Sequence, residues 1–350
     1  MTPLRLASAT SALVISGALL TACGGSGDAD STSAADPGEV TITNCDAEVT
    51  FPSPAQAMYV GGDGNLLAMV LALGAEDQVA GVTGLSDTKA ALSTVYGAEV
   101  VDGLKIATKD YPTMENVIAH KPDVMLAGWN YGYSDEKRLT PDALRDRGIA
   151  GYVLSESCRQ ADGKRGTMPP WEALAADLDN LGKITGHEDE AKKVNTDITQ
   201  RLTALERAPQ AKEAPTVFLF DSGTKEIFTS GSYGGPQAII EAAGAKNATE
   251  SVKDTWTTVS WEQLVTSEPD FIAFVDYDGQ TFANKVKILR SNPATMDLPA
   301  VKEGRFLNLP ITAWTSSPLN IDAAEQLRKG LEEHDLVPAS DIEPEHDLQP

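Results

Sequence analysis

Two stretches of this chain share one design: "ENVIAHKPDVMLAGW" at Glu115–Trp129 and "EQLVTSEPDFIAFVD" at Glu262–Asp276. Each begins with a glutamate, carries a Pro-Asp pair further on, and continues as an apolar run. The first part has helical spacing, the proline ends the helix, and the apolar run is typical of a buried strand. Helix-turn-strand units of this kind occur throughout α/β proteins, so the Pro-Asp pair alone indicates scaffold. Strand packing does not require the glutamate.

The same alternation of strand and helix extends from Val49 through the first copy, and it restarts at Thr216 around the second. Alternation of this kind predicts parallel βαβ units. Between the two halves, residues 187–208 carry apolar side chains at helical spacing, with no strand separating them from the preceding helix. The predicted fold class is therefore α/β, with two Rossmann-like lobes, each with a parallel sheet, joined by one long helix. The predicted segments are an N-terminal lobe at 45–170, connecting helices at 171–208, a C-terminal lobe at 214–336 and a disordered acidic tail at 337–350.

The N-terminus predicts export. Arg5 precedes the apolar run "ALVISGALL", which is too short to remain as a membrane span, and "LTAC" follows, ending at Cys23. This ending resembles a bacterial lipobox, which predicts a lipoprotein signal peptide over 1–22 and lipidation of Cys23. An ordinary signal peptide with an incidental cysteine is the alternative. Residues 23–44, which begin with a Gly/Ser/Asp-rich tract, are predicted to form a flexible tether. The expected location is extracytoplasmic, lipid-anchored to the outer face of the cell membrane.

The remaining cysteines, Cys45 and Cys158, form an even pair in an exported chain. An oxidising compartment favours a disulfide between them, and two separately buried thiols are the alternative.

Composition excludes one class of partner. The chain has 28 Lys and Arg against 51 Asp and Glu, a net charge of −23. Because nucleic acid binding needs a basic surface, no nucleic acid partner is expected.

Catalytic motifs are missing from the sequence. It contains no P-loop, no G-x-S-x-G elbow, no H-E-x-x-H and no G-x-G-x-x-G after a strand. Asp276 and Asp278 are a candidate acid/base pair, but nothing positions a nucleophile beside them. The protein is therefore predicted not to be an enzyme, with no catalytic residues and no cofactor. Its four histidines, His120, His187, His334 and His346, form no visible cluster, so no metal site is predicted.

Five segments in the same order resemble the extracytoplasmic solute-binding proteins that serve ABC importers of iron-siderophores, cobalamin and haem. They are "LALGAEDQVAGVT", "MENVIAHKPDVMLA", "LGKITGHEDEA", "SWEQLVTSEPDFIA" and "LPAVKEGRFLNLP". The resemblance runs from about residue 48 to residue 334. It implies a ligand cleft between the lobes, a monomer, and a partner consisting of an ABC permease dimer with its ATPase. It also implies that Glu115 and Glu262, one on each lobe, pair with arginines of that permease.

Ligand contacts are expected at the carboxyl ends of the parallel strands. Reading the residues that follow the predicted strands gives Asp63, Asn65, Trp129, Tyr131, Tyr133, Tyr233, Trp256, Asp276, Tyr277 and Trp314. The aromatic residues among them predict flat walls for a large organic or metal-chelate ligand.

The residues favour a ferric siderophore of the hydroxamate type or a corrinoid. A strongly anionic tri-catecholate calls for several cleft arginines, and only Arg138, Arg159 and Arg165 are near. Haem would want an axial ligand, for which Tyr233 is the one candidate. The segments "AGWNYGYSDEK" and "DTWTTVSWEQLV" are also similar to an actinobacterial branch associated with a deazaflavin-cofactor precursor. A non-transport sensor or adhesin lipoprotein on the same fold is the competing class.

Overall fold

A parallel β-sheet in each half of the chain forms the framework, which a computed structural model describes over residues 38–277 and 279–350. The N-terminal sheet has the strand order β5-β4-β3-β6-β7, and β8 pairs with β6. Its strands are β3 (Met58–Val60), β4 (Val79–Thr83), β5 (Ile106–Thr108), β6 (Val124–Trp129), β7 (Gly132–Tyr133) and β8 (Ala150–Val153). Its helices are α1 (Asn65–Ala72), η1 (Glu76–Gln78), α2 (Lys89–Tyr96), α3 (Ala98–Gly103), α4 (Met114–Ala119), α5 (Pro141–Arg145) and η2 (Ser155–Ser157).

The C-terminal sheet has the parallel order β12-β9-β14-β15, and a smaller antiparallel sheet, β10-β11-β13, lies in the same lobe. The strands are β9 (Thr216–Phe220), β10 (Ser222–Gly223), β11 (Ile227–Ser230), β12 (Lys246–Asn247), β13 (Trp256–Val259), β14 (Phe271–Asp276) and β15 (Phe306–Pro310). The helices are α8 (Gly235–Ala242), α9 (Trp261–Thr266), α10 (Phe282–Ser291), α11 (Pro299–Glu303), α12 (Ile311–Trp314) and α13 (Asn320–Glu333). The two parallel sheets with their helices confirm the predicted fold class.

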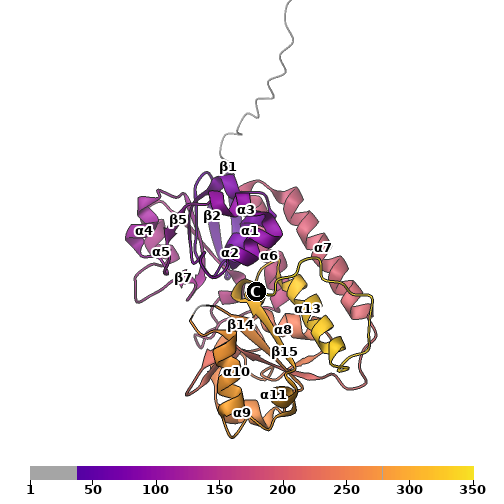
Figure 1. Cartoon of the computed structure of the whole chain (residues 1–350). Helices are drawn as coiled ribbons and strands as arrows, with labels where there is room; N and C mark the ends of the chain where they lie inside the picture. Colours follow the sequence, from indigo (N-terminus) through magenta and orange to yellow (C-terminus); the bar gives the residue numbers. More distant parts are fainter. Residues whose placement is uncertain (1–37, 278) are drawn as a thin grey trace, which may run out of the picture. The chain divides into compact units, whose positions relative to one another are not determined.

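Helices α6 (Pro170–Thr185) and α7 (Glu188–Arg207) connect the lobes. Gly186 ends α6 in the left-handed region, at φ 77°, where glycine is favoured. Helix α7 then buries Ala191, Ile198 and Leu205 on one face. It packs against α1 of the N-terminal lobe and against α8 and α13 of the C-terminal lobe. Figure 1 shows it running beside both lobes, so one rigid element spans the connection.

The aspartates of the two repeated Pro-Asp units bind the backbone in the same way in both lobes. The Asp123 carboxylate accepts hydrogen bonds from the backbone N–H groups of Gln56 and Ala57, at 2.6 and 3.0 Å, just before β3. The Asp270 carboxylate accepts one from the N–H of Thr216, the first residue of β9, at 2.8 Å. Each aspartate thus ties the start of its own buried strand to the start of the neighbouring strand.

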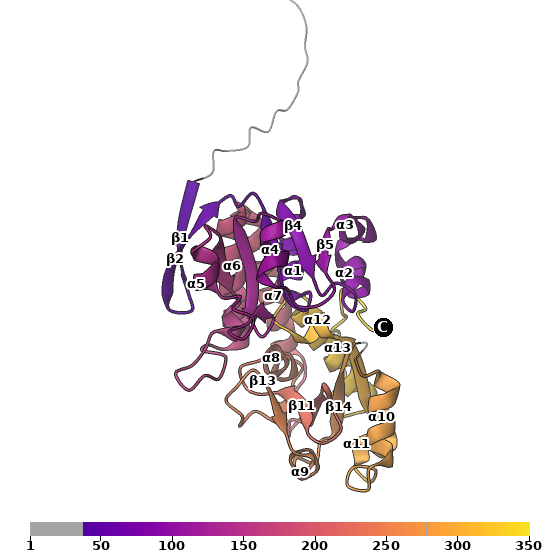
Figure 2. The same cartoon turned by 90° about the vertical axis from the view of Figure 1, so that its left-hand side faces the viewer.

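Residues 38–44 are not flexible tether, which corrects that part of the prediction. Strand β1 (Gly38–Asn44) pairs with β2 (Ala47–Ser53), and Cys45 and Asp46 form the turn with positive φ angles. The Asn44 side chain exchanges two hydrogen bonds with the backbone of Val153. The expected disulfide is present between Cys45 and Cys158, with a Cα–Cα distance of 5.3 Å. Figure 2 shows this hairpin at the edge of the N-terminal lobe.

The C-terminal tail, predicted to be disordered, packs against the protein instead. Its apolar residues Val337 and Leu348 are buried, with exposed fractions of 4% and 3%. The last residues, 347–350, line a pocket together with α2 of the N-terminal lobe and with Tyr277 and Pro310 of the C-terminal lobe. Figure 2 places the C-terminus beside α2 and α13. The tail therefore reaches the junction of the two lobes.

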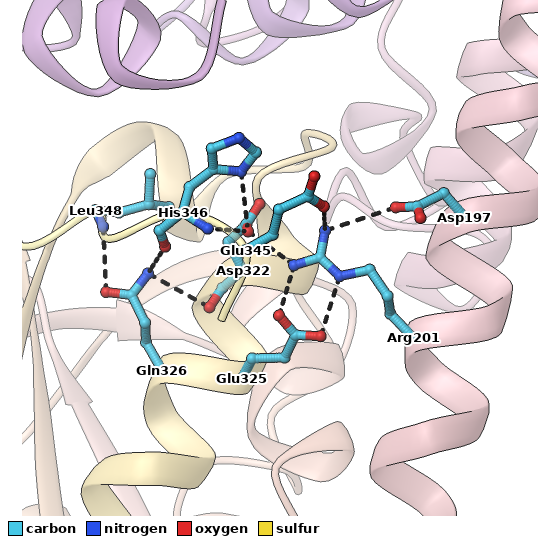
Figure 3. Close-up of polar contacts among 8 residues, drawn as sticks. All are labelled: Asp197, Arg201, Asp322, Glu325, Gln326, Glu345, His346 and Leu348. Carbon is cyan, nitrogen blue, oxygen red and sulfur yellow. Dashed lines mark hydrogen bonds and ion pairs between the residues drawn. The ribbon is translucent and has the colours of Figure 1, made fainter. Parts of the chain in front are cut away.

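Arg201 on α7 is one of the basic residues that hold the acidic tail, beside Arg328 and Lys329 of α13, which bind the Pro338 carbonyl and Glu343. The Arg201 guanidinium binds the buried carboxylates of Asp322 and Glu325 on α13, at 2.7 and 2.5 Å, and Glu345 of the tail at 3.3 Å. Asp322 in turn contacts the His346 ring at 3.2 Å. Figure 3 shows these side chains converging from the two helices and the tail. Composition alone indicated disorder because the compensating arginine lies far away in the sequence.

The predicted signal peptide at 1–22, the lipidation site Cys23 and tether residues 23–37 lie outside the described residues, as does Asp278. Over the part of the chain that is described, no helix combines the length and the apolar character needed to cross a membrane.

Candidate ligand-binding site

A cavity of about 510 Å³ lies between the lobes, and its walls come from both. Most of its lining residues follow the carboxyl ends of parallel strands, where βαβ sheets place their binding groups. The N-terminal lobe and the segment after it contribute Asp63, Gly84, Ser86, Asp87, Thr88, Lys109, Asp110, Tyr111, Asn130, Tyr131 and Arg165. The C-terminal lobe contributes Asp221, Ser222, Phe228, Trp256, Tyr277, Ile311 and Thr315. This cavity is the candidate binding site.

Asp63, in the loop after β3, is held by Tyr111 from the loop after β5. The Tyr111 hydroxyl donates to the carboxylate of Asp63, lying 2.8 and 3.0 Å from its two oxygens. Burial raises the pKa of Asp63 to about 6, against the lowering effect of the Tyr111 hydrogen bond. The negative charges of Asp221 and Asp87 raise this pKa further. The N-terminal wall therefore presents a carboxylate whose ionised form is poorly solvated.

Asp221, directly after β9, is the corresponding acid of the C-terminal wall. The Tyr277 hydroxyl donates to its carboxylate at 3.0 Å. Burial raises the pKa of Asp221, while hydrogen bonds from Ser222 and Tyr277 and the positive charge of Lys285 lower it. The Lys285 ammonium lies 4.5 Å from the centre of the Tyr277 ring and donates to the Val275 carbonyl. Lys285 is fully buried, so this charge is behind the wall and not in the cavity.

Aromatic faces form one side of the cavity. The rings of Phe228 and Trp256 stack with centroids 5.9 Å apart and an interplanar angle of 27°. Both come from the small antiparallel sheet, on β11 and β13. Stacked rings of this kind provide a flat apolar surface for an organic ligand.

Two polar links join the lobes beside the aromatic wall. The buried Glu156 carboxylate, from η2, accepts hydrogen bonds from the Trp256 indole at 3.2 Å and from the Ser316 N–H at 3.0 Å. Its burial raises its pKa to about 7. Arg165 pairs with Asp254 at 3.7 Å. These links fix the position of Trp256 relative to the N-terminal lobe.

The structure brings only some of the sequence-predicted residues together. Those that line the cavity are Asp63, Tyr131, Trp256 and Tyr277. Asn65 and Tyr133 are fully buried, and the Tyr133 hydroxyl donates to the Met125 carbonyl at 3.0 Å. Trp314 is fully buried as well, and its indole donates to the Phe274 carbonyl at 3.0 Å. Asn65, Tyr133 and Trp314 thus pack inside the protein, outside the cavity lining.

Trp129, Tyr233 and Asp276 are also absent from that lining. The Arg159 guanidinium covers the Trp129 ring at 3.6 Å. Tyr233 lies against Gly166, where even a single added carbon would collide with it. Asp276 lines the neighbouring pocket that contains the C-terminus. A position after a strand places a residue near this edge of the sheet, but it does not fix the direction of the side chain.

Sequence reasoning missed several lining residues. Asp221 follows "TVFLF" directly, so the rule that selected Asp63 applies to it equally. Tyr111 follows the short strand β5, which has little apolar signal and was not recognised. Phe228 belongs to the antiparallel sheet, which was not predicted.

The two glutamates of the repeated stretches occupy matching places. Glu115 and Glu262 are exposed residues in the first turns of α4 and α9, whose N-caps are Thr113 and Ser260. Hydrogen bonds from its own backbone N–H and from the Thr113 hydroxyl lower the pKa of Glu115. Both side chains are therefore available to a partner on the surface of each lobe.

Within residues 38–277 and 279–350, no three His, Cys, Asp or Glu side chains are grouped so as to hold a metal ion. The chemistry available in the cavity is stacking, hydrogen bonding and charge recognition.

The family model for "Periplasmic binding protein" matches residues 62–312, which is more than half of the chain. The chain belongs to the periplasmic binding protein family. It is therefore an extracytoplasmic substrate-binding protein of the class that serves ABC transporters, and it is not an enzyme. The family assignment confirms the resemblance found in the sequence.

Curated relatives include a vitamin B12-binding protein of Pectobacterium atrosepticum, 26% identical over 78% of this chain and 87% of the relative. A vitamin B12-binding protein of Yersinia pestis is 23% identical over 64% of this chain and 71% of the relative. Among solved structures, a periplasmic binding protein from Veillonella parvula has a TM-score of 0.70 at 22% identity, covering 85% of this chain and 99% of that one. The structure titled as an ABC-type Fe3+-hydroxamate transport system from Saccharomonospora viridis has a TM-score of 0.67 at 21% identity, covering 83% and 98%. At these identities the structural matches establish the fold.

Proposed function

We propose that this protein is the substrate-binding component of an ABC importer and that its ligand is a ferric siderophore of the hydroxamate type. The observation that carries this proposal is the character of the cavity. It combines aromatic faces with four carboxylates, Asp63, Asp87, Asp110 and Asp221, against the cations Lys109 and Arg165. A neutral or cationic chelate suits such a lining, whereas an anionic one is repelled.

The same lining argues against other ligands of the family. A tri-catecholate chelate carries several negative charges, and Arg165, the one arginine of the lining, is already paired with Asp254. For haem, the candidate axial residue Tyr233 is not in the lining. Cobalamin is the second candidate, because curated relatives are vitamin B12-binding proteins. The similarity to a structure titled as a Fe3+-hydroxamate transport system supports the first candidate.

Delivery to the permease would use Glu115 and Glu262. Their equal positions in the first turns of α4 and α9 place an exposed negative charge at matching points of the two lobes. Because exposed ion pairs contribute little affinity singly, such a pair would act through register and orientation on the permease. The protein would remain at the membrane through a lipid on Cys23.

The ligand is tested by titrating the protein from residue 38 onward and following tryptophan fluorescence. The panel contains a ferric trihydroxamate, a ferric tricatecholate, cobalamin, haem and a deazaflavin. Saturable quenching by the trihydroxamate is expected, and Trp256→Phe should remove most of it, because this ring lines the cavity. Trp129→Phe is the matched control and should retain the quenching. Quenching by cobalamin, by haem or by the tricatecholate, with none by the trihydroxamate, would overturn the assignment.

Docking is tested by an uptake assay in cells that lack the chromosomal copy of the gene. The double variant Glu115→Ala/Glu262→Ala is expected to lose ligand uptake while its affinity for the ligand in solution stays unchanged. Glu99→Ala, an exposed glutamate in the first turn of α3, is the control and should transport normally. Unimpaired uptake by the double variant would contradict the docking assignment.

A further inference from the structure

The cavity contains two acid–tyrosine pairs, one in each wall. Tyr111 donates to Asp63 in the N-terminal wall, and Tyr277 donates to Asp221 in the C-terminal wall. In the described part of the chain, no cation lies within ion-pair distance of either carboxylate, and their direct side-chain partners are hydroxyl groups. Hydroxyl groups orient the carboxylates without neutralising them. Two carboxylates that have no ion-pair partner in the described chain therefore line the cavity.

These carboxylates influence each other across the cavity. The charge of Asp221 raises the pKa of both Asp63 and Tyr111. The buried Lys285 offsets part of the charge of Asp221, but its ammonium is outside the lining and binds the Val275 carbonyl. Bringing two carboxylates together without a cation is unfavourable, and a cation between them relieves the repulsion.

A third group points to a ligand at the same place. The Tyr131 side chain lines the cavity, is only 6% exposed, and its hydroxyl has no hydrogen-bond partner within the described chain. Burial raises the pKa of this hydroxyl, the charges of Glu156 and Asp63 raise it further, and the charge of Arg165 lowers it. Tyr131 shares the cavity lining with Asp63 and Asp221. Buried hydroxyl groups normally have partners, so a buried hydroxyl in the cavity lining without one is a place where a polar group of a ligand can bind.

We propose that Asp63 and Asp221 form a subsite for a protonated amine carried by the ligand, with the Tyr131 hydroxyl as a further hydrogen-bond acceptor. The ligand class is an organic ammonium and not a bare metal ion, because no three metal-ligating side chains are grouped in the described residues. The aromatic faces of Phe228 and Trp256 would hold the apolar part of the same molecule. This inference rests on the proposed function and specifies its ligand. The ligand would be a ferric hydroxamate that carries a free, protonated amine and not an uncharged ferric hydroxamate.

The test compares two forms of one linear ferric trihydroxamate, the first with a free terminal amine and the second with that amine acetylated. A charge-assisted hydrogen bond in a desolvated site is expected to make the amine form bind about tenfold tighter or more. Asp63→Asn and Asp221→Asn should each reduce that preference, and the double variant should abolish it. Asp142→Asn, an exposed aspartate on α5 with 80% of its side chain accessible, removes the same charge and should keep the preference. Equal affinity of the two forms for the native protein would overturn the proposal, and so would an unchanged preference in the double variant.

A different result separates this subsite from the proposed function. If neither ferric chelate binds, the hydroxamate assignment fails, and phenethylammonium is then compared with phenethyl alcohol by tryptophan fluorescence. Tighter binding of the ammonium, lost in Asp63→Asn/Asp221→Asn, would support the amine subsite for another ligand. Equal binding of the two probes, or no binding of either, would overturn it. Circular dichroism of each variant checks that the folded state is retained.

Discussion

The two lobes are built on the same scaffold and differ where they meet the ligand. Lys121 and Glu268 both take a positive φ, at 48° and 42°, directly before the proline of the repeated stretch. The aspartate that follows each proline binds the backbone at the start of a neighbouring strand. The walls of the cavity show no such equivalence, since Tyr111 follows a parallel strand while Phe228 and Trp256 belong to an antiparallel sheet. The sequence that the two lobes share therefore builds the framework, and the segments in which they differ build the ligand site.

The lobes also differ in what fastens their outer segments. The N-terminal hairpin is joined to its lobe by the disulfide between Cys45 and Cys158. The C-terminal tail and α13 are joined to α7 by Arg201. We therefore expect the disulfide, the Arg201 ion pairs and the repeated Pro-Asp units to determine the free energy of unfolding. Ligand preference should instead depend on the two walls of the cavity, which differ between the lobes.

The largest effect on stability is expected for the ion pairs of Arg201, which join α7 to α13 and the C-terminal tail. Arg201→Met would leave Asp322 and Glu325 buried without a cation, which costs about 3–5 kcal/mol when a buried pair is broken. The measurement is the free energy of unfolding in urea. Lys193→Met, on the same helix and 75% exposed, is the control and should change little. A loss below 1 kcal/mol would show that the tail and α13 do not depend on Arg201.

The next largest effect on stability is expected for the disulfide of the N-terminal lobe. Cys45→Ser/Cys158→Ser opens a loop whose ends are 113 residues apart, and loss of such a bridge costs about 2–5 kcal/mol. Urea unfolding of the double variant should show the loss, and the hydrogen bonds between Asn44 and Val153 should retain part of the hairpin. An unchanged unfolding midpoint would mean that the disulfide does not stabilise the folded state.

The repeated units predict matched, smaller losses. Asp123→Ala leaves two backbone N–H groups without their acceptor and Asp270→Ala leaves one, at a cost of about 1–3 kcal/mol for each variant. Because these carboxylates lie away from the cavity, affinity for the ligand should stay the same in both variants. A change in ligand affinity in either variant would contradict the separation between the shared scaffold and the ligand-binding walls.

The smallest effect concerns pH and the N-terminal wall. The pKa of Asp63 is raised from 3.8 to about 6 by burial and by Asp221 and Asp87, while the Tyr111 hydrogen bond lowers it. A folded pKa above the unfolded value means that this group contributes stability at low pH, and that the contribution is lost as pH rises through about 6. Affinity for an ammonium ligand has the opposite dependence, because the carboxylate must be ionised.

Between pH 7 and pH 5 the affinity for the amine-bearing chelate should therefore fall by about tenfold. The measurement is a ligand titration of the native protein at pH 7 and at pH 5. The same titrations of Asp63→Asn should show a smaller change in affinity between the two pH values. Tighter binding at the lower pH would contradict the assigned role of Asp63.

The fold could be predicted because it depends on local patterns. Strand and helix alternate around the Pro-Asp turns, and the spacing of Ala191, Ile198 and Leu205 marks the connecting helix. Asp63 and Trp256 line the cavity, and both could be named from the sequence by reading the residues that follow predicted strands, although Trp256 begins β13. The failures arise from long-range contacts. Trp314 is directed into the core by its hydrogen bond to the Phe274 carbonyl, which no local pattern reveals.

Both outer segments were misjudged for the same reason. Residues 38–44 follow a Gly/Ser-rich tract and were assigned to it, although Val40 and Ile42 alternate with polar residues as in a strand. The tail is acidic and contains proline, but Arg201 of α7 binds its Glu345 and Lys329 of α13 binds its Glu343. Composition describes a segment by itself and cannot report the partner that orders it.

We expect one ligand to bind between the lobes and to contact both walls of the cavity at once. Hydrogen–deuterium exchange of the folded protein, with and without the amine-bearing ferric trihydroxamate, tests this most directly. Protection is expected in the loop containing Lys109 and Tyr111 and, together with it, in β11 and β13, which carry Phe228 and Trp256. Protection confined to one lobe, or located away from these segments, would contradict it.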